Sequence, residues 1–379
     1  MNNHKEREHA LLSASSAHRW LACPPSAVAA EAYPAQDTEF TREGTRAHEV
    51  AEAIATGRIK PGNIETNEDT GVDAEMIDCA IGYRDYIQEQ VKSDKAVILL
   101  EQRVDFSPWV PDGFGTCDCI IIEGNLLTII DYKYGVGVPV SAEDNPQMKL
   151  YALGALNDYG FVYDVNRVEM HIYQPRLNNI SSCSLMVEDL LAWAEKDVKH
   201  TAAKAAKGKG HYCAGAHCKF CPHAGRCRQL TETCTEYFVH RGVGHKLPVL
   251  APHEVAEVLR MKPLVELWLK RVESQALDTL LDGGEVPGYK VVEGKLGNRK
   301  WTDELEVAGI LSEAGYSKED YTETKLLSPA AMDTALGKKK AAELLKDHID
   351  RAPGKPTIVP ASDNRPNYDR TNDFEKLED

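Results

Sequence analysis

Two carboxylates and one lysine stand near the middle of the chain in a pattern that suits metal-assisted hydrolysis. Asp118 opens one run of apolar, β-branched residues, and Asp131 and Lys133 close a second run. Because successive side chains of a strand point to opposite faces, Asp131 and Lys133 share a face. Carboxylates and an ammonium group that converge at the end of a buried hairpin can bind a divalent cation and activate a water molecule.

The element that must position these groups is a β-hairpin. The two apolar runs flank Glu123-Gly124-Asn125, and glycine and asparagine supply the backbone conformations of a tight turn. The run at 96–104 predicts a preceding core strand, on which Glu101 is the notable acid. A glutamate at a strand edge is usually just solvated.

Helices are expected before and after the hairpin. The stretch 41–56 reads as an amphipathic helix that carries His48, and the small Gly44 and Ala47 would let it approach the sheet closely. A lone helical histidine is more often structural. After the hairpin, Asn145-Pro146 begins a second helix, whose Gln147 and Tyr151 share a face because they are four residues apart. The other expected core elements are helices at 74–91 and 190–206 and a strand at 168–174.

Together these motifs resemble a nuclease superfamily. Gly115-Thr116-Cys117-Asp118, a hairpin, and Asp131-Tyr132-Lys133 look like the PD-(D/E)xK nucleases, specifically their RecB-like branch. Gly-x-x-x-His on an earlier helix and Gln-x-x-x-Tyr on a later one are further motifs of that branch. The resemblance covers roughly residues 13–230. It implies an α/β fold with a restriction-endonuclease-like core, in which helices flank a mixed central sheet.

The resemblance also implies a set of metal ligands. Asp118 and Asp131 would bind one or two Mg²⁺ or Mn²⁺ ions, with His48 and Glu101 completing the shell. The backbone carbonyl of Tyr132 is a usual further ligand in this family. Hard oxygen donors suit these cations. The activity implied is metal-dependent hydrolysis of phosphodiester bonds in DNA, with an exonuclease favoured.

Three further residues take roles from the same resemblance. Lys133 would orient the attacking water and stabilise the developing negative charge. Gln147 and Tyr151 would hold the DNA strand and support the site. The chain has no Gly-x-x-x-x-Gly-Lys-Ser/Thr phosphate loop, so we do not expect it to be a helicase itself.

Three cysteines farther along have metal-ligand spacing: Cys218-x-x-Cys221-x-x-x-x-x-Cys227. Thiolate sets of this kind bind zinc or an iron–sulfur cluster, and a fourth ligand is needed. The candidates for it are the local Cys213, His217 and His223 and the distant Cys23.

One cysteine before the core and a C-x₂-C-x₅-C group after it resemble the iron–sulfur staple of RecB-like nucleases. By that match Cys23, Cys218, Cys221 and Cys227 hold a [4Fe-4S] cluster. The cluster would tie the N-terminal helix to the end of the core and close a long loop, which makes the closure entropically valuable. A structural Zn²⁺ site that uses Cys213 is the alternative.

The remaining cysteines are expected to be small buried hydrophobes: Cys79, Cys117, Cys119, Cys183 and Cys234. Cys117 and Cys119 flank Asp118, so both should point to the opposite face of its strand.

Composition limits the possible partners. The net charge of −15 argues against a generally adhesive nucleic-acid binder, although residues 198–231 contain seven Lys or Arg and no acid. Taken alone this stretch indicates a solvated helix end and loop, whereas beside a nuclease site it becomes a candidate phosphate contact. No run approaches the roughly 20 apolar residues of a membrane helix, and the first residues lack a signal-peptide core. We therefore expect a cytoplasmic protein that does not associate with membranes.

The expected organisation has four parts. They are a disordered N-terminus at 1–12, a nuclease core with the cysteine cluster at 13–235, a mainly helical region at 250–350, and a disordered acidic tail at 354–379. The order of motifs resembles an uncharacterised phage-borne RecB-like family. This implies a role in DNA recombination, replication or repair in the bacterial host cytoplasm, with a single-strand-binding or recombination protein as partner. The alternative is a non-catalytic DNA-binding or scaffolding module of a phage replication complex with a structural metal site.

Overall fold

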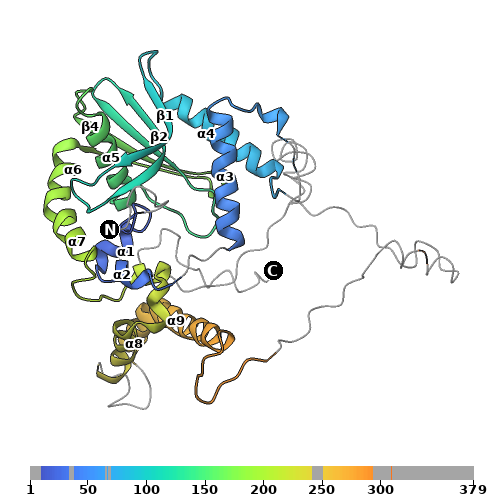
Figure 1. The fold of residues 1–379 in the computed structure, drawn as a ribbon, viewed down its shortest axis with the longest axis vertical. Helices are drawn as coiled ribbons and strands as arrows, with labels where there is room; N and C mark the ends of the chain where they lie inside the picture. The colour runs from blue at the N-terminus through green and yellow to red at the C-terminus, as the bar shows by residue number, and fades with distance from the viewer. Residues whose placement is uncertain are drawn as a thin grey trace, which may run out of the picture. The chain divides into compact units, whose positions relative to one another are not determined.

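A computed structural model describes residues 10–33, 38–64, 66, 70–240, 251–292 and 309 of the 379-residue chain. Its centre is a five-stranded sheet in the order β1-β2-β3-β4-β5 (Figure 1). The strands are β1 (Val97–Asp105), β2 (Phe114–Glu123), β3 (Leu126–Tyr132), β4 (Arg167–Gln174) and β5 (Asn179–Met186). β3 and β4 pair in parallel and the other neighbours pair antiparallel.

Helices cover both faces of the sheet. On one side lie α3 (Glu39–Ala55) and α4 (Ala74–Gln90). On the other lie α5 (Pro146–Tyr159), α6 (Val187–Trp193) and α7 (Lys199–Ala205), with the π-helical turn η4 (Ala194–Val198) between the last two. The parallel β3–β4 pair requires a crossover connection, and α5 provides it.

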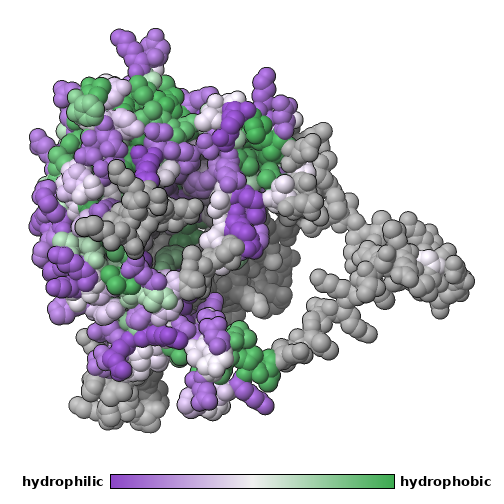
Figure 2. Space-filling view, viewed as in Figure 1, coloured by the Kyte–Doolittle hydropathy of each residue, from purple (hydrophilic) through white to green (hydrophobic). Residues whose placement is uncertain are grey.

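The remaining elements are short or lie at the two ends of the described chain. They are α1 (Ala17–Ala22), α2 (Ser26–Ala30), η2 (Pro61–Asn63), η3 (Pro175–Leu177), η5 (Ala216–Phe220), η6 (Pro222–Arg226), α8 (Arg228–His240) and α9 (Pro252–Leu281). On the face drawn in Figure 2, hydrophilic residues predominate and hydrophobic residues form separate patches. None of the described helices combines the length and the apolar character needed to cross a membrane.

Two hydrophobic cores result from this layering. The first contains Trp20, Ile120 and Leu153 and lies between the sheet and α5, α6, α7 and α1. The second contains Ala47, Tyr83 and other side chains between the sheet and α3 and α4. Strands buried on both faces read as continuous apolar runs, which is why β2 and β3 are so prominent in the sequence.

Side-chain caps fix where the long helices begin. Thr38 Oγ1 accepts the Thr41 N–H at 3.2 Å before α3, and Asp73 Oδ1 accepts the Met76 N–H at 2.8 Å before α4. Asn145 Oδ1 accepts the Gln147 N–H at 3.0 Å before α5. Such caps satisfy amide groups that the first turn leaves unpaired.

The mixed sheet and its flanking helices confirm the predicted α/β class, and the predicted core helices and strands are all present. The edge strand β5 was not predicted. Leu12 belongs to the predicted disordered N-terminus at 1–12, but it is buried in the first core. Gly44 is not a close-approach residue, because a Cβ built on it would meet nothing within 4 Å.

Several sequence predictions concern segments that the structure does not describe. Residues 1–9, the C-terminal region after 292 apart from Gly309, and the acidic tail at 354–379 lie outside the described residues.

Candidate active site

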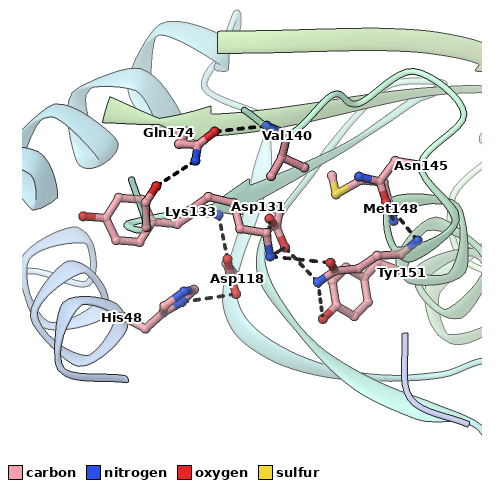
Figure 3. A network of polar contacts seen from close by, with 12 residues as sticks. His48, Asp118, Asp131, Lys133, Val140, Asn145, Met148, Tyr151 and Gln174 are labelled. Carbon is pink, nitrogen blue, oxygen red and sulfur yellow. Dashed lines mark hydrogen bonds and ion pairs between the residues drawn. The ribbon is translucent and has the colours of Figure 1, made fainter. Parts of the chain in front are cut away.

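Three predicted metal ligands from three different elements meet at one point. One ligand atom each from His48 on α3, Glu101 on β1 and Asp118 on β2 lies within 4.8 Å of the others. The imidazole of His48 points from α3 toward Asp118 (Figure 3), with Nδ1 3.5 Å from Oδ1. The other carboxylate oxygen of Asp118 accepts the backbone N–H of Tyr132 at 2.7 Å. One imidazole and two carboxylates form a plausible donor set for a divalent cation.

An irregularity in β1 helps to bring Glu101 into this group. Glu101 has a left-handed backbone, with φ of 48°. Its neighbours Leu100 and Gln102 pair with Cys119 and Cys117, so Glu101 lies opposite Asp118 in an interrupted ladder. Positive φ is uncommon for a residue with a side chain and concentrates at functional sites.

The alternation of side chains slips by one residue at this point. Cys117 packs in the first core, whereas Cys119 packs with Ala47 in the second, on the side of α3 and His48. The prediction that both cysteines point away from Asp118 is therefore wrong for Cys119. The regular two-residue period fails because the ladder is interrupted between Glu101 and Asp118.

Asp131 and Lys133 share a face, as predicted. Lys133 Nζ lies 2.9 Å from Asp131 Oδ2 and donates to Oδ1 at 3.1 Å. Asp131 is 2% exposed, and its Oδ2 has no hydrogen-bond partner in the described chain although the ammonium is close. The Asp131 carboxylate does not belong to the compact group of His48, Glu101 and Asp118. Both of its oxygens lie within 3.1 Å of the Lys133 ammonium.

The Gln-x-x-x-Tyr pair faces Asp131 from the start of α5. Gln147 Nε2 donates to Asp131 Oδ1 at 3.1 Å and to the Tyr151 hydroxyl at 3.2 Å, while its Oε1 lies 3.5 Å from Lys133 Nζ. The Asn145 cap fixes the helix start and hence the place of Gln147. Figure 3 shows Tyr151 approaching Asp131 from the side opposite His48. The predicted catalytic residues thus form two polar groups: His48 with Asp118, and Asp131 with Lys133, Gln147 and Tyr151. The backbone N–H of Tyr132, which Asp118 accepts, connects the first group to the chain of the second.

Burial and mutual repulsion raise the pKa values of Glu101 and Asp118. Burial, together with the charges of Asp118, Glu52 and Asp131, raises the pKa of Glu101 to about 8. Burial also raises the pKa of Asp118 to about 6, although His48 and Lys133 oppose the rise. For Lys133 burial lowers the pKa, but Asp131 and Asp118 outweigh it and the net shift is upward. The metal-free site therefore disfavours the ionised forms of Glu101 and Asp118.

Sequence reasoning did not identify Glu52 or Gln174 as site residues. Glu52 follows His48 by one helical turn on α3, and that i, i+4 spacing was an available signal. Gln174 ends β4 beside the end of β3, and carboxyl ends of parallel strands meet at one edge of a sheet. The backbone N–H of Tyr132 donates to Asp118, and the ring centroid of Tyr132 lies 5.4 Å from that of His48.

The four predicted iron–sulfur ligands follow α1 or lie along and after η5 and η6. Backbone N–H groups approach each of the four predicted sulfurs. Cys213 N lies 3.4 Å from Cys23 Sγ, Gly215 N 3.4 Å from Cys218 Sγ, and Leu230 N 3.5 Å from Cys227 Sγ, while the His223 amide bonds Cys221. Such hydrogen bonds stabilise thiolate ligands.

Cys213, the alternative fourth ligand, has a different environment from the four predicted ligands. Cys213 is exposed and its thiol lies 3.8 Å from the Ala214 carbonyl oxygen. Within the described ranges, the group at Asp118 is the one set of three or more candidate ligand atoms lying within 4.8 Å of one another, and it includes no cysteine. Tetrahedral zinc would hold its sulfurs about 3.8 Å apart, given a Zn–S bond of about 2.3 Å.

Two comparisons place the chain among known proteins. The family model described as "Protein of unknown function (DUF2800)" matches residues 9–366. Among solved structures, the chain is similar to the crystal structure of SSO0001 at 12% identity, over 59% of this chain and 88% of that chain. The TM-score is 0.26, so this likeness carries no argument.

Proposed function

The chain belongs to the DUF2800 family, whose function is unknown, and we propose that it is a divalent-metal-dependent DNA nuclease of the RecB-like PD-(D/E)xK type. The observation that carries the proposal is the meeting of His48, Glu101 and Asp118 beside the Asp131–Lys133 pair. We further propose that the enzyme acts in phage DNA recombination, replication or repair, with an exonuclease favoured and a single-strand-binding or recombination protein as partner.

The chemistry of the donor set fits Mg²⁺ or Mn²⁺. Glu101 and Asp118 offer hard oxygen donors, and Asp131 Oδ2 is a buried oxygen that accepts no hydrogen bond. The raised pKa values of Glu101 and Asp118 show that their ionised forms are disfavoured without a partner, and a cation would stabilise those forms. When bound, the cation would polarise the scissile phosphate and lower the pKa of a water molecule.

The protein's own groups then have separable tasks. Lys133 keeps its proton, because Asp131 and Asp118 raise its pKa, and its ammonium stabilises negative charge that develops on the phosphate. Gln147 holds both Asp131 and Tyr151, so it fixes the carboxylate and the helix start relative to each other. His48 orients Asp118 from α3.

Exposed basic side chains offer a route for the DNA backbone. All seven Lys and Arg between 198 and 231 are exposed: Lys199, Lys204, Lys207, Lys209, Lys219, Arg226 and Arg228. Of these, Lys199 pairs with Glu195. Such a patch binds phosphates irrespective of sequence. This local basic surface is compatible with a net charge of −15.

We propose that Cys23, Cys218, Cys221 and Cys227 hold a [4Fe-4S] cluster. All four sulfurs accept backbone N–H hydrogen bonds, which suits thiolate ligation. Cys23 follows α1 directly, so its ligation would tie the N-terminal segment to the end of the core.

The deciding experiment is digestion of end-labelled DNA by protein purified without oxygen, in Mg²⁺, Mn²⁺ or EDTA. We expect cleavage in either metal and none in EDTA. Asp118→Asn and Lys133→Ala should each reduce it by at least a thousandfold while the protein stays folded. DNA binding without any cleavage by the wild type would instead support a non-catalytic DNA-binding module.

A further inference from the structure

The connection between Lys133 and Gln147 begins and ends at the candidate site. The two side chains lie 3.5 Å apart, so the intervening residues form a closed loop beside them. We call residues 135–140 the valine loop. Its first five residues are exposed, and Val136 and Val138 are 48% and 49% exposed.

A single buried amide holds the base of the valine loop. Gln174 is 2% exposed, and its Nε2 donates to the carbonyl oxygens of Gly135 at 2.7 Å and Val138 at 3.1 Å. Its Oε1 accepts the N–H of Val140 at 3.1 Å (Figure 3) and Asn179 Nδ2 at 3.0 Å. Both donors and both acceptor positions of the side chain are used. The loop is therefore fixed while it keeps two valines in solvent.

Two glycines in the loop have no reason inside the molecule to be glycine. A Cβ built on Gly135 or Gly137 meets no described atom within 4 Å, and neither residue has positive φ. Glycine also serves where a ligand must approach the backbone closely. Fixed, exposed apolar side chains that alternate with such glycines indicate a surface for an external ligand.

We propose that the valine loop is a substrate-contacting element, in which Val136 and Val138 pack against a nucleobase next to the scissile phosphate. The inference rests on the proposed nuclease function, because only a DNA strand at Asp118 and Lys133 brings a base to this place. Gly135 and Gly137 let the sugar–phosphate backbone pass closely, and Gln174 is the positioning residue that holds the loop in place.

The test compares intact and abasic DNA. The double variant Val136→Ser/Val138→Ser should raise KM about tenfold and change kcat little, the order expected for loss of one base contact. DNA with one abasic residue at the contacted position should raise the KM of the wild type by the same factor. It should not raise the KM of the double variant further. Gly137→Ala should raise KM without lowering Tm, because its Cβ has open space in the folded protein.

Matched controls lie elsewhere on the surface. Val162 is 61% exposed in the turn after α5. Gln147 lies at the start of α5, and the 14 residues of this helix span about 20 Å, so the two residues lie at opposite ends of it. Gly62→Ala also adds a Cβ that meets nothing within 4 Å. Val162→Ser and Gly62→Ala should both leave KM unchanged.

Binding separates this inference from the proposed function. With Ca²⁺ in place of Mg²⁺, affinity for labelled DNA should fall about tenfold in the double variant, whether or not the wild type cleaves DNA in Mg²⁺. Unchanged KM and unchanged affinity in the double variant, or an equal loss on abasic DNA at every position, would overturn the valine-loop proposal. A wild type that binds DNA but never cleaves it overturns the nuclease and leaves the loop to be decided by affinity. A wild type that does not bind DNA overturns both.

Discussion

Gly115 on β2 and Tyr151 on α5 are packed so closely that a Cβ on Gly115 would lie 2.9 Å from Cε1 of Tyr151. The Tyr151 hydroxyl is bonded to Gln147, and Gln147 is bonded to Asp131. The absence of a side chain at Gly115 thus allows α5, which carries Gln147 and Tyr151, to pack closely against β2.

We expect Gly115→Ala to displace Tyr151 and, through it, Gln147. The overlap is with a ring packed in the core, so unfolding free energy should fall by about 1–3 kcal/mol. DNA cleavage should fall on the order of tenfold or more, because small misplacements near reacting groups are costly. Chemical denaturation and cleavage kinetics measure the two effects. Gly44→Ala is the control: its Cβ has open space on a helix, so it should raise the unfolding free energy by up to about 1 kcal/mol.

A second prediction concerns metal binding without turnover. Saturating Mn²⁺ should raise the Tm of the wild type, since a ligand at 100 times its Kd stabilises by about 2.7 kcal/mol. Asp118→Asn should lose most of that rise. Without metal it should be at least as stable as the wild type, because burial raises the pKa of Asp118 and disfavours its charge.

The control for this measurement is Asp189→Asn, an exposed acid on α6 across the sheet from His48. It should keep the full Mn²⁺-dependent rise in Tm. An Asp118→Asn protein that responds to Mn²⁺ as the wild type does would exclude Asp118 as a ligand.

The fold class and the network around Asp131 were predictable because each depends on a local period. Continuous apolar runs mark the buried strands β2 and β3, and i, i+4 spacing places Gln147 and Tyr151 on one face. Strand alternation likewise places Asp131 beside Lys133.

The features that were missed depend on tertiary context. The left-handed backbone of Glu101 interrupts a ladder inside an ordinary strand-forming run, and no residue type there announces it. The edge strand β5 alternates half-buried and exposed residues but is rich in Ser and Asn, which weaken the strand signal. Gln174 gains its role from four partners that lie 5 to 39 residues away in sequence.

A third prediction separates the two candidate fourth ligands of the cysteine cluster. Cys23→Ser should lower the iron and sulfide content of anaerobically purified protein, remove its broad visible absorption and reduce Tm, because Cys23 is buried and its sulfur accepts an amide hydrogen. Cys213→Ser should keep all three properties, since that thiol is exposed. The opposite pattern, with zinc in place of iron, would favour the zinc site.

The last prediction follows from the pKa of Glu101. The carboxyl titrates near 4.5 in the unfolded chain and at about 8 in the folded metal-free protein. Between those values the folded state binds the additional proton, so this group makes the protein less stable as pH rises. Glu101→Gln removes the dependence. We expect its stability advantage over the wild type to grow from pH 5 to pH 8.5, reaching on the order of 1–2 kcal/mol after solvent screening.

Urea unfolding at several pH values, in EDTA and in Mn²⁺, measures this difference. In Mn²⁺ the sign should reverse, because a bound cation gives the Glu101 carboxylate a partner that glutamine replaces poorly. The control is Glu123→Gln on neighbouring β2, where hydrogen bonds from Ser93 and Lys92 lower the pKa. That glutamate stabilises the fold above its unfolded pKa, so its replacement should slightly destabilise the protein at neutral pH. An advantage of Glu101→Gln that is independent of pH would show that burial does not raise the pKa of Glu101.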